Sequence, residues 1–177
     1  MSTPRPEAPL RGALTTLRAW ELEDAEWYVT ARDEEIFRWT TEPRKLDAGV
    51  VRAAITQNAR EPKFVGLAIT DRQTGELIGN ISLVLSDLER GQVEVSYWLA
   101  PVGRGRGAAT DAVRVICRWA FDSLPVDRIE LRTKHGNAAS QRVAARTGFE
   151  PVGERDGQLL FALTQPAANP HEPVTST

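Results

Sequence analysis

The residues best suited to ligand chemistry form one glycine-rich loop. Three alternating glycines and two arginines precede small residues, in the order Gly103-Arg104-Gly105-Arg106-Gly107-Ala108. Glycines let a backbone approach a ligand closely and turn its N–H groups inward. The loop is expected between a strand and an amphipathic helix, so the orphan amides at the helix start add to the charge of the arginines. The loop therefore predicts a phosphate site.

Other interpretations of this loop are a Walker A motif, a dinucleotide-binding fingerprint and a turn without a ligand. A Walker A motif is excluded because no Gly-Lys-Ser/Thr follows. The fingerprint fits Gly103, Gly105 and Ala108, with Glu130 as the ribose-binding acid. However, the loop follows roughly 100 residues that include a predicted three-strand meander, Glu130 lies in the middle of a predicted strand, and no second βαβ half follows.

Two side chains near the loop are suited to proton transfer. Glu94 is a carboxylate within an otherwise apolar strand, and burial would raise its pKa toward the range of a general base. Strand alternation places Glu94 on one face with Ser96 and Trp98, opposite Val93, Val95 and Tyr97. The alternative for Glu94 is a solvated or ion-paired residue. His135 lies in a loop, where we expect it to be solvated rather than catalytic.

Periodicity and turn residues predict the elements that position these side chains. Strands are expected over 14–20, 63–70, 76–85, 92–100, 128–134, 152–154 and 158–163. Helices are expected over 23–32, 48–59, 105–122 and 137–146, with Asp47 and Asn137 as N-caps. This order predicts a mixed α/β fold with antiparallel strands before a crossover connection.

Length and composition favour one globular domain. The 177 residues are 41% hydrophobic and 26% charged, which excludes a wholly disordered chain and a collagen. Prolines concentrate near both ends, so the domain is predicted over 12–165, with flexible tails over 1–11 and 166–177. The single cysteine, Cys117, permits no internal disulfide and is expected in the core. No metal site, secretory signal or membrane span is predicted, and we expect a cytoplasmic protein.

Charge is distributed unevenly although the net charge is only −2. Residues 21–35 contain seven acids and one base, whereas residues 101–146 contain nine bases and four acids. The two stretches are either solvated helical faces or, more specifically, a surface that attracts cations and a site for anions. Nucleic-acid binding is not expected, because the bases gather around one loop and the chain is acidic overall.

Two motifs resemble the GNAT N-acyltransferases, and most closely the branch that acetylates ribosomal-protein N-termini. The first is Ser96-Tyr97-Trp98-Leu99-Ala100-Pro101 followed by Arg104-Gly105-Arg106-Gly107-Ala108-Ala109-Thr110. The second is Asn137-Ala138-Ala139-Ser140 followed by Arg146-Thr147-Gly148-Phe149. The resemblance is sharp over 92–150 and extends by strand order over 14–164.

The resemblance implies a mixed sheet whose central parallel strands splay apart, with helices on both faces, and acetyl-CoA as co-substrate. The implied cofactor-binding residues are Trp98, Leu99, Ala100, Gly103, Arg104, Gly105, Arg106, Gly107, Ala108 and Asn137. Related enzymes use a serine at the position of Ser140 on the leaving thiolate. We therefore expect Glu94 as the base and Ser140 as the hydroxyl that hydrogen-bonds the thiolate.

The sequence departs from the family pattern at two positions. Val102 replaces the Gln or Arg that often begins the loop, and Ala144 replaces the tyrosine that many members use as a general acid. The chain is still predicted to transfer an acetyl group to a primary amine, on a protein N-terminus or a small molecule, with a cationic acceptor favoured by the acids of 21–35. The alternative is a non-catalytic acyl-CoA sensor. A monomer or homodimer is expected.

Overall fold

The computed structural model describes residues 5–165 and builds them around a single mixed sheet. Its strand order is β1-β2-β3-β4-β5-β6-β8-β7. The strands are β1 (Leu10–Arg11), β2 (Thr15–Ala19), β3 (Phe64–Asp71), β4 (Leu77–Val84), β5 (Gln92–Leu99), β6 (Arg128–Thr133), β7 (Glu150–Arg155) and β8 (Gln158–Thr164). The helices are α1 (Ala25–Thr30), α2 (Glu34–Trp39), α3 (Ala48–Asn58), α4 (Ala108–Ser123) and α5 (Ala138–Arg146).

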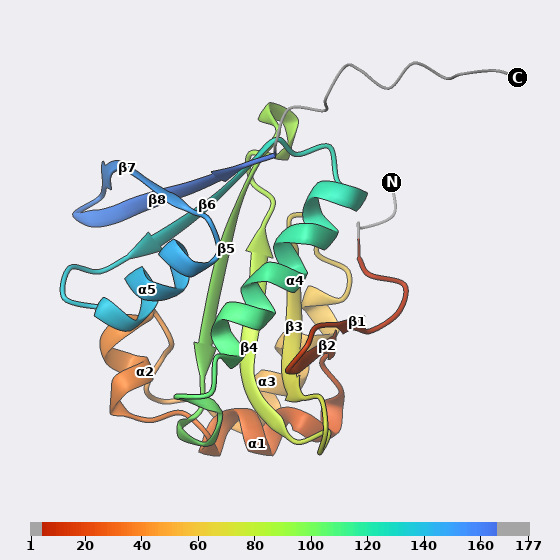
Figure 1. Cartoon of the computed structure of the whole chain (residues 1–177). Helices are drawn as coiled ribbons and strands as arrows, with labels where there is room; N and C mark the ends of the chain where they lie inside the picture. The colour runs from red at the N-terminus through yellow and green to blue at the C-terminus, as the bar shows by residue number, and fades with distance from the viewer. Residues whose placement is uncertain (1–4, 166–177) are drawn as a thin grey trace, which may run out of the picture.

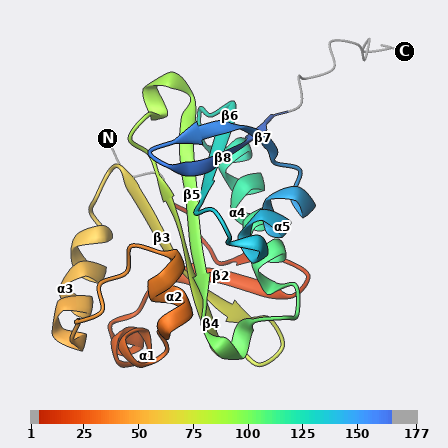
Figure 2. The same cartoon turned by 90° about the vertical axis from the view of Figure 1, so that its left-hand side faces the viewer.

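The helices form two layers on opposite faces of the sheet. Helices α4 and α5 lie on one face (Figure 1), and α1, α2 and α3 lie on the other, as the turned view in Figure 2 shows. The predicted mixed α/β fold with helices on both faces is therefore confirmed. No described helix has the length and apolar character needed to cross a membrane.

Strands β5 and β6 are parallel and separate after only three residue pairs. The pairing runs from Gln92 opposite Arg128 to Glu94 opposite Glu130, although β5 continues for five more residues. On its other side, β5 stays paired with β4 as far as Leu99. The predicted splay of the central strands is thus present, and it leaves one side of the carboxyl half of β5 without a strand partner.

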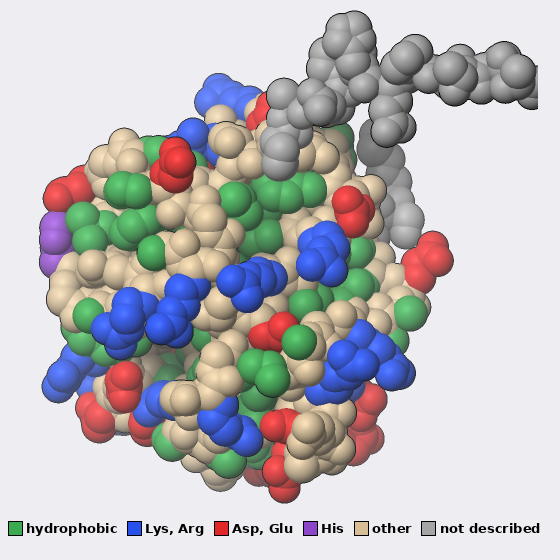
Figure 3. Space-filling model, viewed as in Figure 1, with side chains coloured by type: hydrophobic (Ala, Val, Ile, Leu, Met, Phe, Trp, Pro, Cys, Tyr) green, Lys and Arg blue, Asp and Glu red, His purple; other side chains and the backbone are tan. Residues whose placement is uncertain are grey.

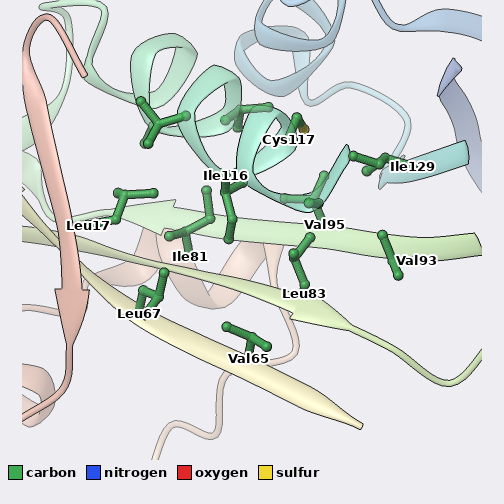
Figure 4. Packing of buried hydrophobic residues seen from close by; sticks show 14 of the residues in the cluster. Leu17, Val65, Leu67, Ile81, Leu83, Val93, Val95, Ile116, Cys117 and Ile129 are labelled. Atoms are coloured by element: carbon green, nitrogen blue, oxygen red, sulfur yellow. The ribbon is translucent and has the colours of Figure 1, made fainter. Parts of the chain in front are cut away.

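The main core lies between the sheet and α4. Ile116 and Cys117 of α4 pack toward Val93 and Val95 of β5 (Figure 4). Cys117 is a core residue, as predicted, and burial raises the pKa of its thiol to about 12. Thiolate chemistry at Cys117 is therefore suppressed near neutral pH.

Several elements and bounds differ from those predicted. Residues 10–11 form β1 against β2, so the ordered domain begins before the expected boundary at residue 12. Helix α2 was not predicted, and β7 is longer than the three residues expected. Helix α4 starts at Ala108 rather than Gly105, because the glycines before it adopt non-helical backbone angles. Residues 1–4 of the predicted N-terminal tail (1–11) and the whole predicted C-terminal tail (166–177) lie outside the described residues.

The carboxylate of Asp111 links the start of the domain to the beginning of α4 by hydrogen bonds. Asp111 accepts hydrogen bonds from the backbone N–H groups of Ala13, Leu14 and Thr15, at 2.8–3.0 Å, and from the Thr15 hydroxyl at 2.8 Å. A side chain at Gly12 would collide with this carboxylate. Asp111 thereby holds the segment that leads into β2 beside the helix that follows the glycine-rich loop.

Replacing Asp111 by alanine should destabilise the protein by about 2–4 kcal/mol, because three backbone donors and one hydroxyl lose their acceptor together. Urea unfolding of the purified variant measures the change. Asp122, near the opposite end of α4, makes no comparable hydrogen bond within the described chain and is the matched control. Asp122→Ala should change the free energy of unfolding by less than about 0.5 kcal/mol. Equal losses in the two variants would contradict this role of Asp111.

Candidate active site

The glycine-rich loop connects β5 to α4 through a short 3-10 turn over Pro101–Gly103. Gly103 is buried, and a Cβ on it would lie 2.9 Å from the Ile78 carbonyl oxygen, so close packing requires glycine there. Gly105 and Gly107 have φ angles of +76° and +80°, which side chains disfavour. A Cβ at Gly105 would meet nothing within 4 Å. The first glycine is thus required by packing and the other two by backbone conformation.

Backbone donors gather where the loop meets α4. Gly107 is the N-cap of this 16-residue helix, and the first intrahelical bond from this cap runs from the Asp111 N–H to the Gly107 carbonyl. The first N–H groups of a helix have no partner within the helix and carry the positive end of its dipole. The segment from Gly105 to Ala109 therefore presents the donors that a pyrophosphate group needs.

The free side of β5 presents backbone groups to the gap left by β6. The Ala100 N–H donates to the Ile78 carbonyl at 2.9 Å, which makes these two residues a hydrogen-bonded pair of the β4–β5 ladder. Along an antiparallel ladder, hydrogen-bonded residue pairs alternate with pairs that are not hydrogen-bonded to each other. The backbone groups of Tyr97 and Leu99 consequently face away from β4 and toward the gap. An extended ligand can pair there with the Tyr97 groups and the Leu99 N–H, whereas the Leu99 carbonyl already accepts from Arg104.

The two arginines of the loop have different surroundings. Arg104 donates two hydrogen bonds of 2.8 Å to Asp33 and one of 3.0 Å to Glu35, and its Nε donates to the Leu99 carbonyl at 3.1 Å. The predicted role of Arg104 as a phosphate ligand therefore competes with two carboxylates. Arg106 is more exposed and reaches Asp71 at 3.5 Å, so its charge is more available to a ligand.

The pair between Arg104 and Asp33 persists at low pH. The hydrogen bond from Arg104 lowers the pKa of Asp33 to about 2. Because an unfolded aspartate titrates near pH ~4, the pair contributes stability above that pH and loses it as the pH falls toward about 2. The contact between the loop and α2 is therefore intact throughout the neutral range.

Helix α2 is held at both ends by residues that flank the gap. Its N-cap, Asp33, is bound by Arg104 of the glycine-rich loop. Near its other end, the Arg38 carbonyl accepts a hydrogen bond of 2.8 Å from Lys134, and Trp39 lies beside Gly136. Helix α2 was missed by the sequence analysis, although its capping aspartate and the two acids that follow are an N-terminal signature.

Ser140 and Asn137 lie together at the start of α5. Asn137 is the N-cap, as predicted, and its side-chain oxygen accepts the Ser140 N–H at 3.2 Å. Its amide nitrogen remains a donor for another group. The Ser140 hydroxyl accepts a hydrogen bond of 3.1 Å from the Tyr97 hydroxyl of β5. Burial raises the pKa of Tyr97, so its phenol keeps its proton near neutral pH.

Glu94 lies on the face of β5 opposite to Tyr97, and it forms an ion pair there. Its two oxygens accept from Arg132 at 3.0 and 2.9 Å, and the carboxylate is partly exposed. Glu130, its register partner on β6, is buried and paired with Arg128 and Arg155. The predicted alternation of Glu94, Ser96 and Trp98 on this face is consistent with the burial along the strand. His135 is exposed beside Glu154.

An aromatic cluster forms the wall of this second face. Trp98 is buried, stacks on Trp27 with ring centroids 6.1 Å apart, and donates to Glu42 at 3.2 Å. Tyr28 packs edge-on against Trp98 and also donates to Glu42. Of the predicted cofactor residues, Trp98 thus directs its ring away from the face that holds α5. Sequence reasoning missed Glu42, which lies in a loop 56 residues before its Trp98 partner.

Surface charges distinguish the two sides of the gap. Lys and Arg side chains recur across the face that carries α4 and α5 (Figure 3), where Arg114, Arg118, Arg142 and Arg146 are exposed. On the other side, five of the seven acids of 21–35 pair with arginines, namely Asp24, Glu26, Asp33, Glu34 and Glu35. The expected cation-attracting surface is therefore largely neutralised within the chain.

Comparison with known proteins identifies this arrangement. Residues 15–150 match the family model described as the acetyltransferase (GNAT) domain. The chain belongs to the GNAT acetyltransferases. It is 35% identical over 155 residues to "Probable N-acetyltransferase YjcK" of Bacillus subtilis, covering 81% of this chain and 84% of that relative. These matches support an acetyl-CoA-dependent N-acetyltransferase and confirm the family predicted from the two motifs.

The predicted resemblance to the ribosomal branch is also confirmed. "Putative ribosomal N-acetyltransferase YdaF" of Bacillus subtilis is 37% identical over 90 residues, covering 50% of this chain and 49% of its own length, so the match spans about half of each protein. The solved structure of RimL, a ribosomal L7/L12 alpha-N-protein acetyltransferase in complex with coenzyme A, matches with a TM-score of 0.78. That match has 15% identity and covers 89% of this chain and 98% of the RimL chain, which shows a shared fold.

The residues present suit coenzyme A at the gap. A pyrophosphate fits the amides of the glycine-rich loop, and an extended arm fits the unpaired backbone of β5. The described residues hold no group of three or more His, Cys, Asp or Glu side chains that could bind a metal.

Replacing Gly105 by valine should reduce coenzyme A affinity at least about 100-fold, because a branched side chain disfavours the loop conformation and occupies the ligand's approach. Gly75, in the turn between β3 and β4, has a φ of +77° and equally open surroundings, so it is a matched control. Gly75→Val should cost similar stability and leave the affinity unchanged. Calorimetric titration with coenzyme A measures both variants. Wild-type affinity in Gly105→Val would contradict the assignment of the loop.

Proposed function

We propose that this protein transfers the acetyl group of acetyl-CoA to a primary amine, on a protein N-terminus or a small molecule, by direct attack in a ternary complex. The observation that carries the proposal is the separation of β5 and β6 directly beside the loop and the start of α4. One side of this gap suits the co-substrate, and the exposed Ser96 on the other face of β5 leaves room for an acceptor. The predicted non-catalytic sensor has no specific feature of the structure in its favour.

The proposed roles follow from position. Backbone groups of Leu99 and Gly103–Ala108 hold the co-substrate, together with Arg106 and the amide of Asn137. The Leu99 N–H, which faces the gap, donates to the oxyanion that forms when the amine attacks the acetyl carbon. As the carbon–sulfur bond breaks, its electron pair leaves with the sulfur, and the Ser140 hydroxyl donates a hydrogen bond to that thiolate. A serine hydroxyl suffices because a thiol of pKa near ~8.5 is a fair leaving group.

Glu94 is proposed to accept the proton of the amine through a water molecule. Both of its oxygens already accept from Arg132, so a direct contact with the amine would displace the guanidinium. The partial exposure of Glu94 leaves room for water on its remaining lone pairs. With a water molecule as relay, Glu94 can accept the proton of the amine and keep its ion pair with Arg132.

The acceptor is proposed to be an amine whose approach is bounded by α2 and the aromatic cluster of Trp27, Tyr28 and Trp98. The names of YdaF and RimL make ribosomal-protein N-termini the first acceptors to test. Because the acids of 21–35 are largely paired, charge alone does not select a strongly cationic acceptor.

Incubation with acetyl-CoA and a panel of amines tests the function. The panel contains peptides with the N-terminal sequences of ribosomal proteins, the same peptides with blocked N-termini, and small primary amines. We expect release of free coenzyme A together with acetylation at one amine class, measured with a thiol reagent and by mass spectrometry. Coenzyme A binding without turnover on the whole panel would favour the sensor, and absence of binding would reject the proposal.

Replacing Glu94 by glutamine should lower turnover about 10²–10⁴-fold at neutral pH and leave coenzyme A affinity unchanged. The loss should shrink as the pH rises toward the pKa of the acceptor, because the free amine then needs no base. A pH profile of kcat measures this. Glu130→Gln is the control, since Glu130 is the register partner of Glu94 and also pairs with arginines. It should lower stability without a pH-dependent loss of kcat. If Glu94→Gln lowers kcat less than about threefold, Glu94 is structural.

A further inference from the structure

The hydrogen bond between Tyr97 and Ser140 joins two elements that flank the gap. Tyr97 is on β5, Ser140 is in the first turn of α5, and 43 residues separate them in the chain. Tyr97 also packs against the main hydrophobic core, which fixes its ring. A phenol anchored in the core thus holds a hydroxyl at the start of a helix.

Strand register places this pair close to the point where β5 and β6 separate. Tyr97 lies three residues beyond Glu94, and Thr133 lies three residues beyond Glu130, the partner of Glu94. Alternation puts Tyr97 and Thr133 on the same face as the buried Val95 and Leu131. The two residues therefore occupy equivalent positions on the diverging strands, on the face that carries α5.

Thr133 supplies an independent observation about this region. Thr133 is only 2% exposed, and its hydroxyl has no hydrogen-bond partner within the described part of the chain. A buried hydroxyl without a partner is costly, and such groups in native proteins call for a specific explanation. Beyond the point where β5 and β6 separate, the face of β6 that carries α5 thus holds a buried hydroxyl that has no partner among the described residues.

The direction of the Tyr97 hydrogen bond determines what Ser140 can do. Because the phenol remains protonated and donates, the Ser140 oxygen is the acceptor, and the hydrogen of Ser140 is left for another group. A hydroxyl that accepts a hydrogen bond is polarised and becomes a better donor. The pair therefore favours a Ser140 hydroxyl that donates to a third group.

We infer that Tyr97 is a positioning residue, which holds the Ser140 hydroxyl so that its hydrogen is directed to the sulfur of the co-substrate. The inference rests on the proposed function, since it assigns that sulfur to the gap. Tyr97 takes no part in bond making. The amine nitrogen bonds the acetyl carbon, the carbon–sulfur electron pair goes to sulfur, and Ser140 stabilises the resulting thiolate through a hydrogen bond.

The test compares Tyr97→Phe, Ser140→Ala and the double variant. Ser140→Ala should lower kcat about 5–150-fold, and Tyr97→Phe should lower it by a smaller factor, because each removes transition-state stabilisation. The double variant should be no slower than Ser140→Ala, since Tyr97 acts only through Ser140. Affinity for acetyl-CoA should stay within about twofold in all three, so the loss is in kcat rather than in binding.

A second measurement does not depend on turnover. The thiol of bound coenzyme A is titrated by the ultraviolet absorbance of its thiolate, and wild-type protein should hold its pKa below the free value. Tyr97→Phe and Ser140→Ala should each raise that pKa by about one half to one pH unit, because the thiolate loses a hydrogen bond. Tyr28→Phe, which removes a buried phenol on the other face of the sheet, should leave it unchanged.

The outcomes separate this inference from the proposed function. An unchanged thiol pKa in Tyr97→Phe, or rate losses that multiply in the double variant, would overturn the positioning role while the acetyltransferase proposal stands. A wild-type protein that binds no coenzyme A would instead reject the proposed function. If Tyr97→Phe unfolds, the Ser140→Ala titration decides, because an unchanged thiol pKa there removes the group that Tyr97 is inferred to position.

Discussion

The whole site depends on a sheet that stops pairing in its middle. Backbone donors and acceptors inside a protein are normally satisfied, and a strand that lacks a neighbour exposes a row of both. Here β5 keeps β4 on one side and loses β6 on the other after Glu94. The unpaired half of β5 has the directional chemistry of a sheet edge although it lies in the centre of the sheet. The glycine-rich loop and the start of α5 are placed at this interior edge by chain connectivity.

Several charged side chains around the gap are paired within the fold. Arg104 is held by Asp33 and Glu35, and Glu94 is held by Arg132. For the proposed anionic co-substrate, we therefore expect the backbone amides and the helix dipole to contribute more binding energy than the loop charges. The two faces of the sheet are also electrostatically distinct, with exposed arginines on the α4 and α5 side and largely paired acids on the α2 side.

Local signals predicted most of the fold, including the elements that carry the proposed cofactor-binding residues. Alternation along β5 placed Glu94 and Trp98 on one face, and the cap at Asn137 was identified from residue type alone. The contacts that the sequence did not predict join residues far apart in the chain. Arg104 meets Asp33 across 71 residues, and Trp98 meets Glu42 across 56, so no window of sequence contains either pair. The six-residue α2 was missed for a related reason, because tertiary ties rather than periodicity support so short a helix.

The two ties of α2 have a consequence for which substitutions this helix can accept. At one end the tie needs a carboxylate at position 33, but at the other it uses the main-chain carbonyl of Arg38, which any residue supplies. Between these ties, Ile36 is buried against Trp98 and Ala100, so exchange that leaves the helix in position is confined to exposed side chains such as that of Arg38. The exposed surface of α2 is therefore decoupled from the contact between Arg104 and Asp33 that joins this helix to the glycine-rich loop.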